Sequence, residues 1–240
     1  MGHIALEVDG ARIAFTDRHD GVSLAPYDTA NLGFATGDDP AAVTENRRRV
    51  AYALDGDRDS EQRWAWARQV HGGRVARVDA PGRRGDADAL VSTGAGISLV
   101  VLVADCAPIA LVAGGTVAAV HCGWRGLTAG VIPAAVQAVR EHGRSPVRAV
   151  VGPCISPAHY EFGAEELDAV TQRIGPVVRS RTEAGTSALD LRAGVAAALA
   201  SAGVVDRTDV GVCTYESVDY FSHRRDGVTG RQALIVTSGS

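Results

Sequence analysis

A cysteine and a histidine in one dense segment are the residues of this chain most suited to chemistry. The segment is residues 97–126, ISLVVLVADCAPIALVAGGTVAAVHCGWRG. Gly114-Gly115 at its centre predicts the turn of a β-hairpin. Counting back from that turn places Cys106 opposite Gly123, and His121 is then its diagonal neighbour, about 7–8 Å away between backbones. Side chains at that separation can share a metal ion or a proton.

Three interpretations of the Cys106–His121 pair are open. The cysteine can be a buried structural residue beside a hydrogen-bonded histidine, since cysteine is among the most buried residue types. It can be a nucleophile with His121 as its base. It can also bind a metal, because thiolate and imidazole are zinc ligands, but two ligands do not make a site. Pro108 cannot donate to a strand ladder and predicts a sheet edge or a bulge in the first strand of the hairpin.

A third metal ligand has to come from another part of the chain, and His71 is the best placed of the other histidines. It follows the strand-like segment WAWARQV and precedes Gly72-Gly73, so its ring is displayed at the end of a strand. His142 belongs to the end of a predicted helix, where a solvated cation is common. The spacing of His71 alone is also compatible with a plain turn residue.

The elements that must position these residues are read from hydrophobic periodicity and from capping signals. Asp39-Pro40 predicts the start of a helix that ends before Gly56. Asp190 and Gly203 bound another helix in the same way. We expect helices at 40–54, 128–142, 164–174 and 190–202. A hairpin is expected around Asp9-Gly10, and further strands at 63–70, 74–79, 88–92, 97–104, 107–112, 116–121, 147–151, 208–213 and 231–237.

This order of elements predicts the fold class. Strands come in adjacent pairs, and helices are inserted between the groups, which favours an α+β fold with mixed sheets flanked by helices. The polar stretch 179–188 is interpreted as a loop rather than a domain boundary. We therefore expect residues 1–240 to form a single domain.

Composition excludes several classes of protein. The chain has no lysine among its 24 basic residues, which excludes a pyridoxal-phosphate enzyme and a lysine-bearing P-loop. A net charge of −4 gives no reason to expect nucleic acid or an anionic membrane as partner. No apolar run reaches membrane-spanning length, and Met1 to Val8 does not resemble a signal peptide, so a cytoplasmic location is predicted. Four scattered cysteines do not indicate a disulfide scaffold.

Arginines are the candidates for binding an anion. Arg47 lies on the apolar face of the predicted helix 40–54, where it either packs as a structural residue or binds phosphate. Arg125 and the loop residues Arg224 and Arg225 compete for the phosphate role. A charged loop residue is otherwise simply solvated.

Short motifs run in order from about Gly21 to the C-terminus. They are NLG (31–33), DDPAAVTENR (38–47), QVHG (69–72), DADALV (86–91), ADCAPI (104–109), HCGWRG (121–126), GPCI (152–155) and FSHRRDGVTGR (221–231). Together they closely resemble the YfiH, or laccase-domain, family of purine nucleoside phosphorylases. The resemblance implies a YfiH-like, cysteine-hydrolase-like fold. It also implies that His71, Cys106 and His121 bind zinc.

The resemblance allows some expectations about the centre. Three protein ligands leave one tetrahedral position open, which is typical of a catalytic zinc whose bound water ionises near neutral pH. Asp105 adjoins Cys106 and is a candidate proton carrier or partner of the ligands. Cys122 stands where the family more often has alanine, but its side chain should face away from that of His121. His223 is not counted as a ligand.

The resemblance implies phosphorolysis of adenosine, inosine, guanosine and methylthioadenosine, together with adenosine deamination. Purine nucleosides and phosphate are then the partners, and no obligate protein partner is inferred. A peptidoglycan-precursor editing amidohydrolase and a metal-independent Cys–His hydrolase stay open as alternatives. Copper polyphenol oxidation is disfavoured, because the chain has seven histidines, no His-x-His pair and methionine only at position 1.

Overall fold

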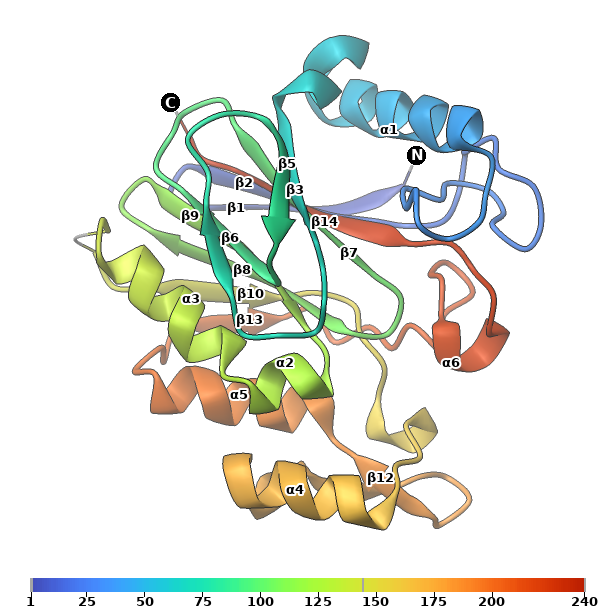
Figure 1. Ribbon diagram of the computed structural model, residues 1–240, viewed down its shortest axis with the longest axis vertical. Coiled ribbons are helices and arrows are strands. Elements are labelled where there is room, and N and C mark those ends of the chain that lie inside the picture. Colours follow the sequence, from blue (N-terminus) through green and yellow to red (C-terminus); the bar gives the residue numbers. More distant parts are fainter. Residues whose placement is uncertain (1, 144, 240) are drawn as a thin grey trace.

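The computed structural model describes residues 2–143 and 145–239, so the predicted single domain over 1–240 includes three residues outside the described part. Four layers are stacked in Figure 1: helix α1 (Pro40–Asp55), two β-sheets, and a second group of helices on the far side. The architecture is α+β with mixed sheets flanked by helices, and the fold class expected from the sequence is confirmed.

The first sheet has six strands and lies beneath α1. Its order is β1-β2-β14-β7-β3-β5. The β1–β2 hairpin and β14 pair antiparallel, whereas β7, β3 and β5 run parallel to one another. The strands are β1 (His3–Val8), β2 (Ala11–Thr16), β3 (Trp64–Arg68), β5 (Gly82–Asp86), β7 (Ser98–Val103) and β14 (Gln232–Thr237).

The second sheet also has six strands, in the order β13-β10-β8-β9-β6-β4. Its central hairpin has the predicted register, with Ala113 opposite Thr116 across the glycine turn. The strands are β4 (Val75–Arg77), β6 (Ala89–Ser92), β8 (Ala107–Ala113), β9 (Thr116–Cys122), β10 (Arg148–Val151) and β13 (Arg207–Asp209).

Pro108 does not mark an edge or a bulge, and that expectation was wrong. Strand β8 lies inside the sheet, between β10 and β9. Pro108 is opposite His121 on one side, and it lies one residue beyond Ile109–Val151, the last pair with β10. Its carbonyl still accepts a hydrogen bond from the N–H of Gly152. The pair of Pro108 and Gly152 therefore has one hydrogen bond instead of two, at the point where the pairing with β10 ends.

Helix ends follow the capping signals, with one correction. The Asp39 side chain caps α1, and Gly56 ends it with φ 71°. Helices α4 (Ala164–Ile174) and α5 (Leu191–Ser201) lie where they were expected. The helix predicted at 128–142 is shorter, α3 (Val131–Arg140), and a separate helix that was not predicted, α2 (Trp124–Thr128), precedes it. Gly130 separates them because its φ of 81° is left-handed and cannot continue a helix.

Several smaller elements were not predicted, among them β5. The stretch 179–188, expected to be a loop, contains a small antiparallel pair, β11 (Arg179–Arg181) and β12 (Ser187–Leu189). A short helix, α6 (His223–Asp226), lies within the last motif of the sequence. The strand expected at 208–213 is limited to β13, since Gly211 adopts φ 73°.

Three hydrophobic cores separate the layers. The core between the two sheets includes Phe15, Leu99 and Ala119. A second core lies between the other face of the second sheet and helices α3 and α5. A third, around Trp64 and Ile235, lies beneath α1. Burial of this apolar surface is the main force that holds the sheets in place and therefore the site that they build.

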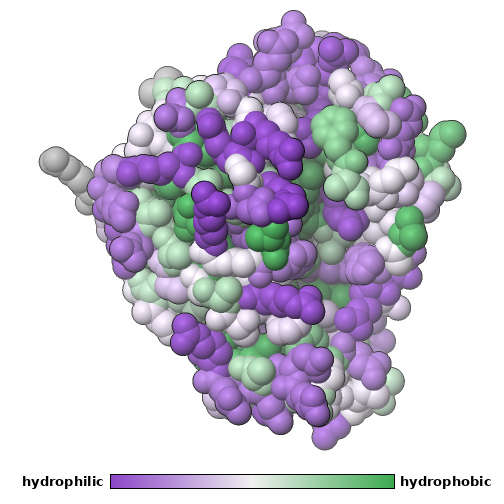
Figure 2. Space-filling view, viewed as in Figure 1, coloured by the Kyte–Doolittle hydropathy of each residue, from purple (hydrophilic) through white to green (hydrophobic). Residues whose placement is uncertain are grey.

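The outer surface is mixed. The face shown in Figure 2 is largely hydrophilic, with hydrophobic residues in separate small areas. Among the described residues, no helix is long and apolar enough to cross a membrane.

The chain passes from the first sheet to the second three times, after β3, after β5 and after β7, at the same end of these parallel strands. Strands β3 and β7 are parallel neighbours, so their carboxyl ends lie side by side. The segment after β3 leads to β4, and the segment after β7 leads to β8, both in the second sheet. This arrangement places residues far apart in sequence next to one another where the two sheets meet.

Candidate metal centre

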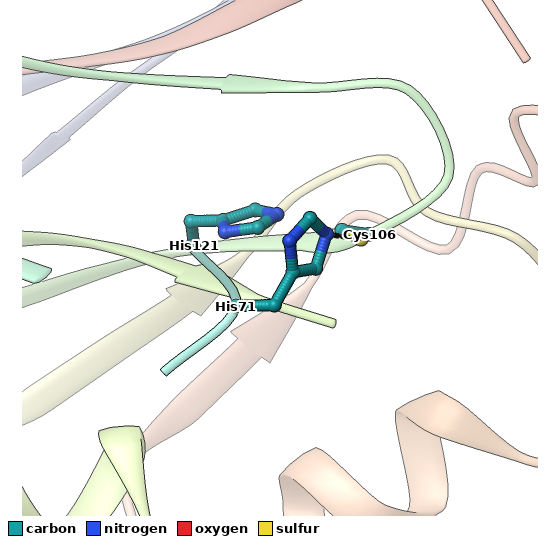
Figure 3. A group of neighbouring side chains, drawn as sticks. All are labelled: His71, Cys106 and His121. Atoms are coloured by element: carbon teal, nitrogen blue, oxygen red, sulfur yellow. Dashed lines mark hydrogen bonds between the residues drawn. The ribbon is translucent and has the colours of Figure 1, made fainter. Parts of the chain in front are cut away.

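The three residues expected to bind metal meet at this edge. His71 lies on the segment after β3, Cys106 on the segment after β7, and His121 near the end of β9 (Figure 3). One ligand atom from each residue lies within 4.8 Å of the other two. The His71 Nε2 atom is 3.9 Å from Cys106 Sγ, and the two imidazole rings are 4.7 Å apart at 79°.

This geometry fits a metal ion. Zinc bonds sulfur at about 2.3 Å and histidine nitrogen at about 2.0 Å, so one ion can touch both atoms when they are less than about 4.3 Å apart. The 3.9 Å separation of His71 and Cys106 satisfies that limit. Within the described residues, no other group of three or more histidine, cysteine and acidic side chains is arranged so that it could hold a metal ion. A cavity of about 320 Å³ beside Trp64 and Leu54, at the end of α1, includes none of the three ligands.

A buried aspartate, Asp88, holds two of the three ligands. Its Oδ1 atom is 2.8 Å from Nδ1 of His121 and accepts the backbone N–H of His71 at 2.9 Å. Its Oδ2 atom accepts the backbone N–H groups of Val70 and Gly72 at 3.2 and 2.7 Å. A bond from Nδ1–H to the carboxylate leaves Nε2 of His121 as the free ligand atom. Sequence reasoning missed this residue, although it lies within the DADALV motif.

Two ligand-bearing segments have unusual backbone geometry. His71 has φ 58° and Asp105, beside Cys106, has φ 85°. Non-glycine residues in the left-handed region cost of order 1–3 kcal/mol each, and such residues cluster at functional sites. At His71 this conformation is held by the Asp88 carboxylate, which binds three consecutive N–H groups there.

The charges of the centre favour a thiolate at Cys106. Burial alone would raise the pKa of this thiol, but the charge and hydrogen bonds of His121 and His71 outweigh it and lower the pKa. Burial would lower the pKa of His121, yet Cys106 and Asp88 raise it. Both directions favour the thiolate form of Cys106 and the protonated form of His121.

Cys122 is not a rival ligand. Its side chain faces the core between the second sheet and the helices, as the alternation along β9 predicts. Burial raises its pKa well above the ordinary range of a thiol. Burial likewise raises the pKa of Cys154 to about 12.

Asp105 is buried and is connected to a different part of the chain. Its Oδ1 atom accepts the Thr214 hydroxyl at 2.7 Å, and its Oδ2 atom accepts the backbone N–H of Arg224 at 2.7 Å. Arg224 is the second residue of α6. The carboxylate of Asp105 thus fixes α6 beside the metal centre, and its role as a proton carrier stays a prediction.

The arginines predicted for phosphate binding occupy different environments. Arg47 is only 4% exposed, donates from Nε and Nη2 to the Leu32 carbonyl, and lies over the rings of Phe34 and Trp66. Burial lowers its pKa to about 10. Arg125 is exposed above the ring of Trp124.

Arg224 is exposed, whereas Arg225 is held by the protein. Arg224 is exposed and lies over the ring of Tyr160, 5.1 Å from its centroid. Arg225 donates to the backbone carbonyls of 214, 215, 217 and 220 and pairs with Asp226, so it is a structural residue. Sequence reasoning did not single out Arg231, whose charge lies within electrostatic reach of Cys106 and Asp105.

Aromatic side chains lie beside the centre. Trp124 immediately follows Gly123, where a Cβ would come within 2.8 Å of Cys106 Sγ. Trp124 and Tyr160 each make an edge contact with Phe162. Burial and the negative charges of Cys106 and Asp105 raise the pKa of Tyr160, so this ring is near the ligands and its hydroxyl stays protonated.

The chain is similar to known proteins along most of its length. Residues 12–238 match the family described as multi-copper polyphenol oxidoreductase laccase. A purine nucleoside phosphorylase of Streptomyces coelicolor is 48% identical over an alignment of 238 positions, and the match covers 95% of this chain and 96% of that protein. The purine nucleoside phosphorylase YfiH of Shigella flexneri is 37% identical, covering 95% of this chain and 93% of that protein.

A solved structure is similar over nearly the whole fold. The crystal structure of YlmD from Geobacillus stearothermophilus superimposes with a TM-score of 0.88 at 32% identity, covering 97% of this chain and 93% of that one. Sequence and structure thus agree along almost the full length of the chain. The chain belongs to the multi-copper polyphenol oxidoreductase laccase family, the YfiH-type family that its motifs predicted.

Proposed function

We propose that this protein is a zinc-dependent purine nucleoside phosphorylase of the cytoplasm. Its substrates would be adenosine, inosine, guanosine and methylthioadenosine, split by phosphate into the free base and ribose 1-phosphate or methylthioribose 1-phosphate. It would also deaminate adenosine to inosine. The observation that carries the proposal is the convergence of His71, Cys106 and His121, in a chain whose relatives are named purine nucleoside phosphorylases.

Zinc is the metal that the donor set supports best. One thiolate and two imidazoles are zinc ligands, and a lone set of three leaves a position for substrate or water. The same set also occurs in blue-copper sites, where a methionine is the usual axial ligand. Methionine occurs in this chain only at position 1, and the described residues offer one metal-binding group, whereas a multicopper oxidase needs several. The family name alone therefore does not favour copper here.

The chemistry divides between the metal and the side chains around it. Bound zinc supplies a Lewis acid with one open position. In phosphorolysis a phosphate oxygen forms a bond to C1′ of the ribose, the bond from C1′ to N9 breaks, and the purine leaves with a proton. Arg47 and Arg125 are the arginines that the sequence nominates to hold phosphate, and Asp105 is its candidate for moving the proton. The aromatic rings of Trp124 and Tyr160 offer surfaces against which a purine can stack.

A phosphate titration tests the proposal. Zinc-loaded protein with inosine should release hypoxanthine only when phosphate is present, and ribose 1-phosphate should appear in equal amount. Adenosine should give adenine by the same route and some inosine. Chromatography of the products measures both reactions. Base release without phosphate would show hydrolysis instead, and copper at several equivalents with oxygen consumption on phenols would show an oxidase.

A metal-independent Cys–His hydrolase is the second candidate. The observation that favours it is the contact of His71 Nε2 with Cys106 Sγ at 3.9 Å, next to a thiol whose pKa is lowered. An amide-linked peptidoglycan precursor is the substrate to test. Hydrolysis of this amide by chelator-treated protein, abolished by thiol alkylation and with no action on nucleosides, would replace the phosphorylase proposal.

A further inference from the structure

Arg231 lies beside the metal centre because of the strand register. Strand β14 starts at Gln232, which pairs with Val103, the last residue of β7. One step further along this antiparallel pair, Arg231 lies opposite Ala104. The next two residues of that chain are Asp105 and Cys106. A cationic side chain is therefore placed at the strand end from which a metal ligand projects.

The backbone of Arg231 is fixed by the segment Asn31-Leu32-Gly33. The Asn31 side chain accepts the N–H of Arg231 at 2.9 Å, and the carbonyl of Arg231 accepts the N–H of Leu32 at 3.0 Å. Gly33 lies against the stem of the arginine, since a Cβ there would be 3.1 Å from its Cγ. A residue larger than glycine at this position would push the side chain away. The NLG motif thus sets the direction of the arginine.

Only one nitrogen of the Arg231 guanidinium forms hydrogen bonds with the described residues. Its Nη1 atom donates to the carbonyls of Thr229 and Gly230 at 2.9 and 2.8 Å. Its Nε and Nη2 atoms have no hydrogen-bond partner among the described residues, and no described carboxylate forms a salt bridge with it. Burial lowers its pKa, while the negative charges of Cys106 and Asp105 act in the opposite direction. A partly buried cation without a counter-ion is unusual in a folded protein.

The other arginines near the centre are already occupied or lie at the surface. Arg47 donates from Nε and Nη2 to the Leu32 carbonyl and is only 4% exposed. It therefore supports the segment against which Arg231 lies. Arg225 is bound to four carbonyls and to Asp226. Arg125 and Arg224 are exposed above aromatic rings.

We propose that Arg231 binds an oxyanion, inorganic phosphate, at the edge of the metal centre through its Nε and Nη2 atoms. Two donors on one side of a planar guanidinium match two oxygens of a phosphate. The inference rests on the proposed phosphorolysis for its role, because that reaction needs a phosphate held near the nucleoside. It names a residue for binding the second substrate, a role for which the sequence offered Arg47, Arg125, Arg224 and Arg225 as candidates.

Kinetics and direct binding test this assignment together. The variants are Arg231→Gln, Arg231→Lys and Arg47→Gln, with Arg173→Gln on the exposed face of α4 as the matched control for loss of one positive charge. Each zinc-loaded protein is assayed for the KM of phosphate and the KM of inosine. Calorimetric titration with inorganic phosphate alone measures binding without turnover, and elemental analysis measures the metal.

We expect Arg231→Gln to raise the KM of phosphate and the Kd of phosphate by about 10- to 100-fold, since it removes two charge-assisted hydrogen bonds. The KM of inosine and the metal content should stay within twofold of the parent protein. Arg231→Lys should fall between the parent and the glutamine variant, because it keeps the charge and loses the paired donors. Arg173→Gln should match the parent.

Several results would overturn the inference. An unchanged phosphate KM in Arg231→Gln, with a parent enzyme that requires phosphate, would reject Arg231 while leaving phosphorolysis in place. A rise confined to Arg47→Gln would restore the assignment made from the sequence. Loss of metal or of fold in both Arg231 variants would make the residue structural. If the parent releases base without phosphate, phosphorolysis fails, and phosphate calorimetry still decides whether Arg231 forms an anion site.

Discussion

Two buried aspartates, Asp88 and Asp105, lie at the candidate metal centre and make different contacts. The Asp88 carboxylate binds the ring of His121 and the backbone of His71 and its two neighbours, so it contacts two of the three segments that carry the candidate ligands. Asp105 adjoins the ligand Cys106 in sequence, yet its carboxylate binds Thr214 and the backbone of Arg224. Asp88 positions the candidate ligands, and Asp105 positions α6 beside them.

The difference shows that proximity in sequence is a poor guide to function in this centre. Asp105 touches a ligand through the chain but directs its side chain to α6. Asp88 lies seventeen residues from the nearest ligand in the chain and still determines which nitrogen of His121 is free. The hydrogen-bond partners of a ligand, rather than its neighbours in sequence, orient it toward a metal.

The largest effect is expected when a candidate ligand itself is removed. Cys106→Ser should lose stoichiometric metal and all phosphorolysis, because a hydroxyl is a far weaker zinc ligand than a thiolate. Elemental analysis after dialysis measures the metal. Cys122→Ser is the matched control and should keep its metal, since that thiol faces the core. If the first variant keeps its metal and the second loses it, the thiol ligand is Cys122 and not Cys106.

Changing each aspartate to asparagine separates their roles. Asp88→Asn should weaken zinc binding by about 10- to 100-fold, the usual loss when the partner of a histidine ligand is removed. The amide keeps one acceptor oxygen, so at least one of the N–H groups that Asp88 now binds loses its partner. Competition with a chromophoric chelator gives the Kd. Asp105→Asn should leave this Kd within about twofold, and an equal loss in both variants would refute the division of labour.

Asp105→Asn should lower substrate turnover through α6 and leave metal binding unchanged. An asparagine has one acceptor oxygen and no charge, so it cannot accept both the Thr214 hydroxyl and the Arg224 N–H as the carboxylate does, and α6 is held less firmly. We expect about a 3- to 10-fold fall in kcat/KM with metal content unchanged, equivalent to one lost hydrogen bond. Steady-state kinetics on inosine test this expectation. Thr214→Val should reproduce part of the fall, and full activity in both variants would contradict it.

The smallest expected effect is on the acidity of the thiol. In metal-free protein, Cys106 should react with iodoacetamide near neutral pH, because His121 and His71 lower its pKa. The thiolate is the reactive form, so the rate should fall as the pH drops below that lowered pKa. Asp88→Asn should move the midpoint to higher pH, since Asp88 favours the charged form of His121. Mass spectrometry identifies the site, and a midpoint shifted equally by Asp105→Asn would argue against the comparison.

Local patterns predicted the parts of the fold that local interactions determine. The glycine turn specified the β8–β9 register, and the caps at Asp39 and Asp190 located their helices. The division between α2 and α3 was missed because apolar periodicity continues through Gly130, which only its φ of 81° reveals as a break. Strand β5 was missed because GRRGD has no apolar alternation and is held by pairing with β3.

The site, like the fold, was predictable only where a residue's type or local sequence identifies it. His71, Cys106 and His121 have side chains whose chemistry identifies them, and the structure brings them together. Asp88 and Arg231 act through contacts that depend on the tertiary structure, at sequence separations of 33 residues to His121 and 200 residues to Asn31. Their types alone do not distinguish them from other aspartates and arginines. Their positions within DADALV and GVTGR were the only available signal.

The junction between the two sheets also links metal binding to thermal stability. His71, Cys106 and His121 are separated by 35 and 15 residues, and only the packed sheets bring them to one point. An unfolded chain lacks this arrangement, so the metal binds the native state almost exclusively. Free zinc at a hundred times its Kd would then raise the free energy of unfolding by about 2.7 kcal/mol. The melting temperature of the whole domain would therefore depend on how much zinc is available.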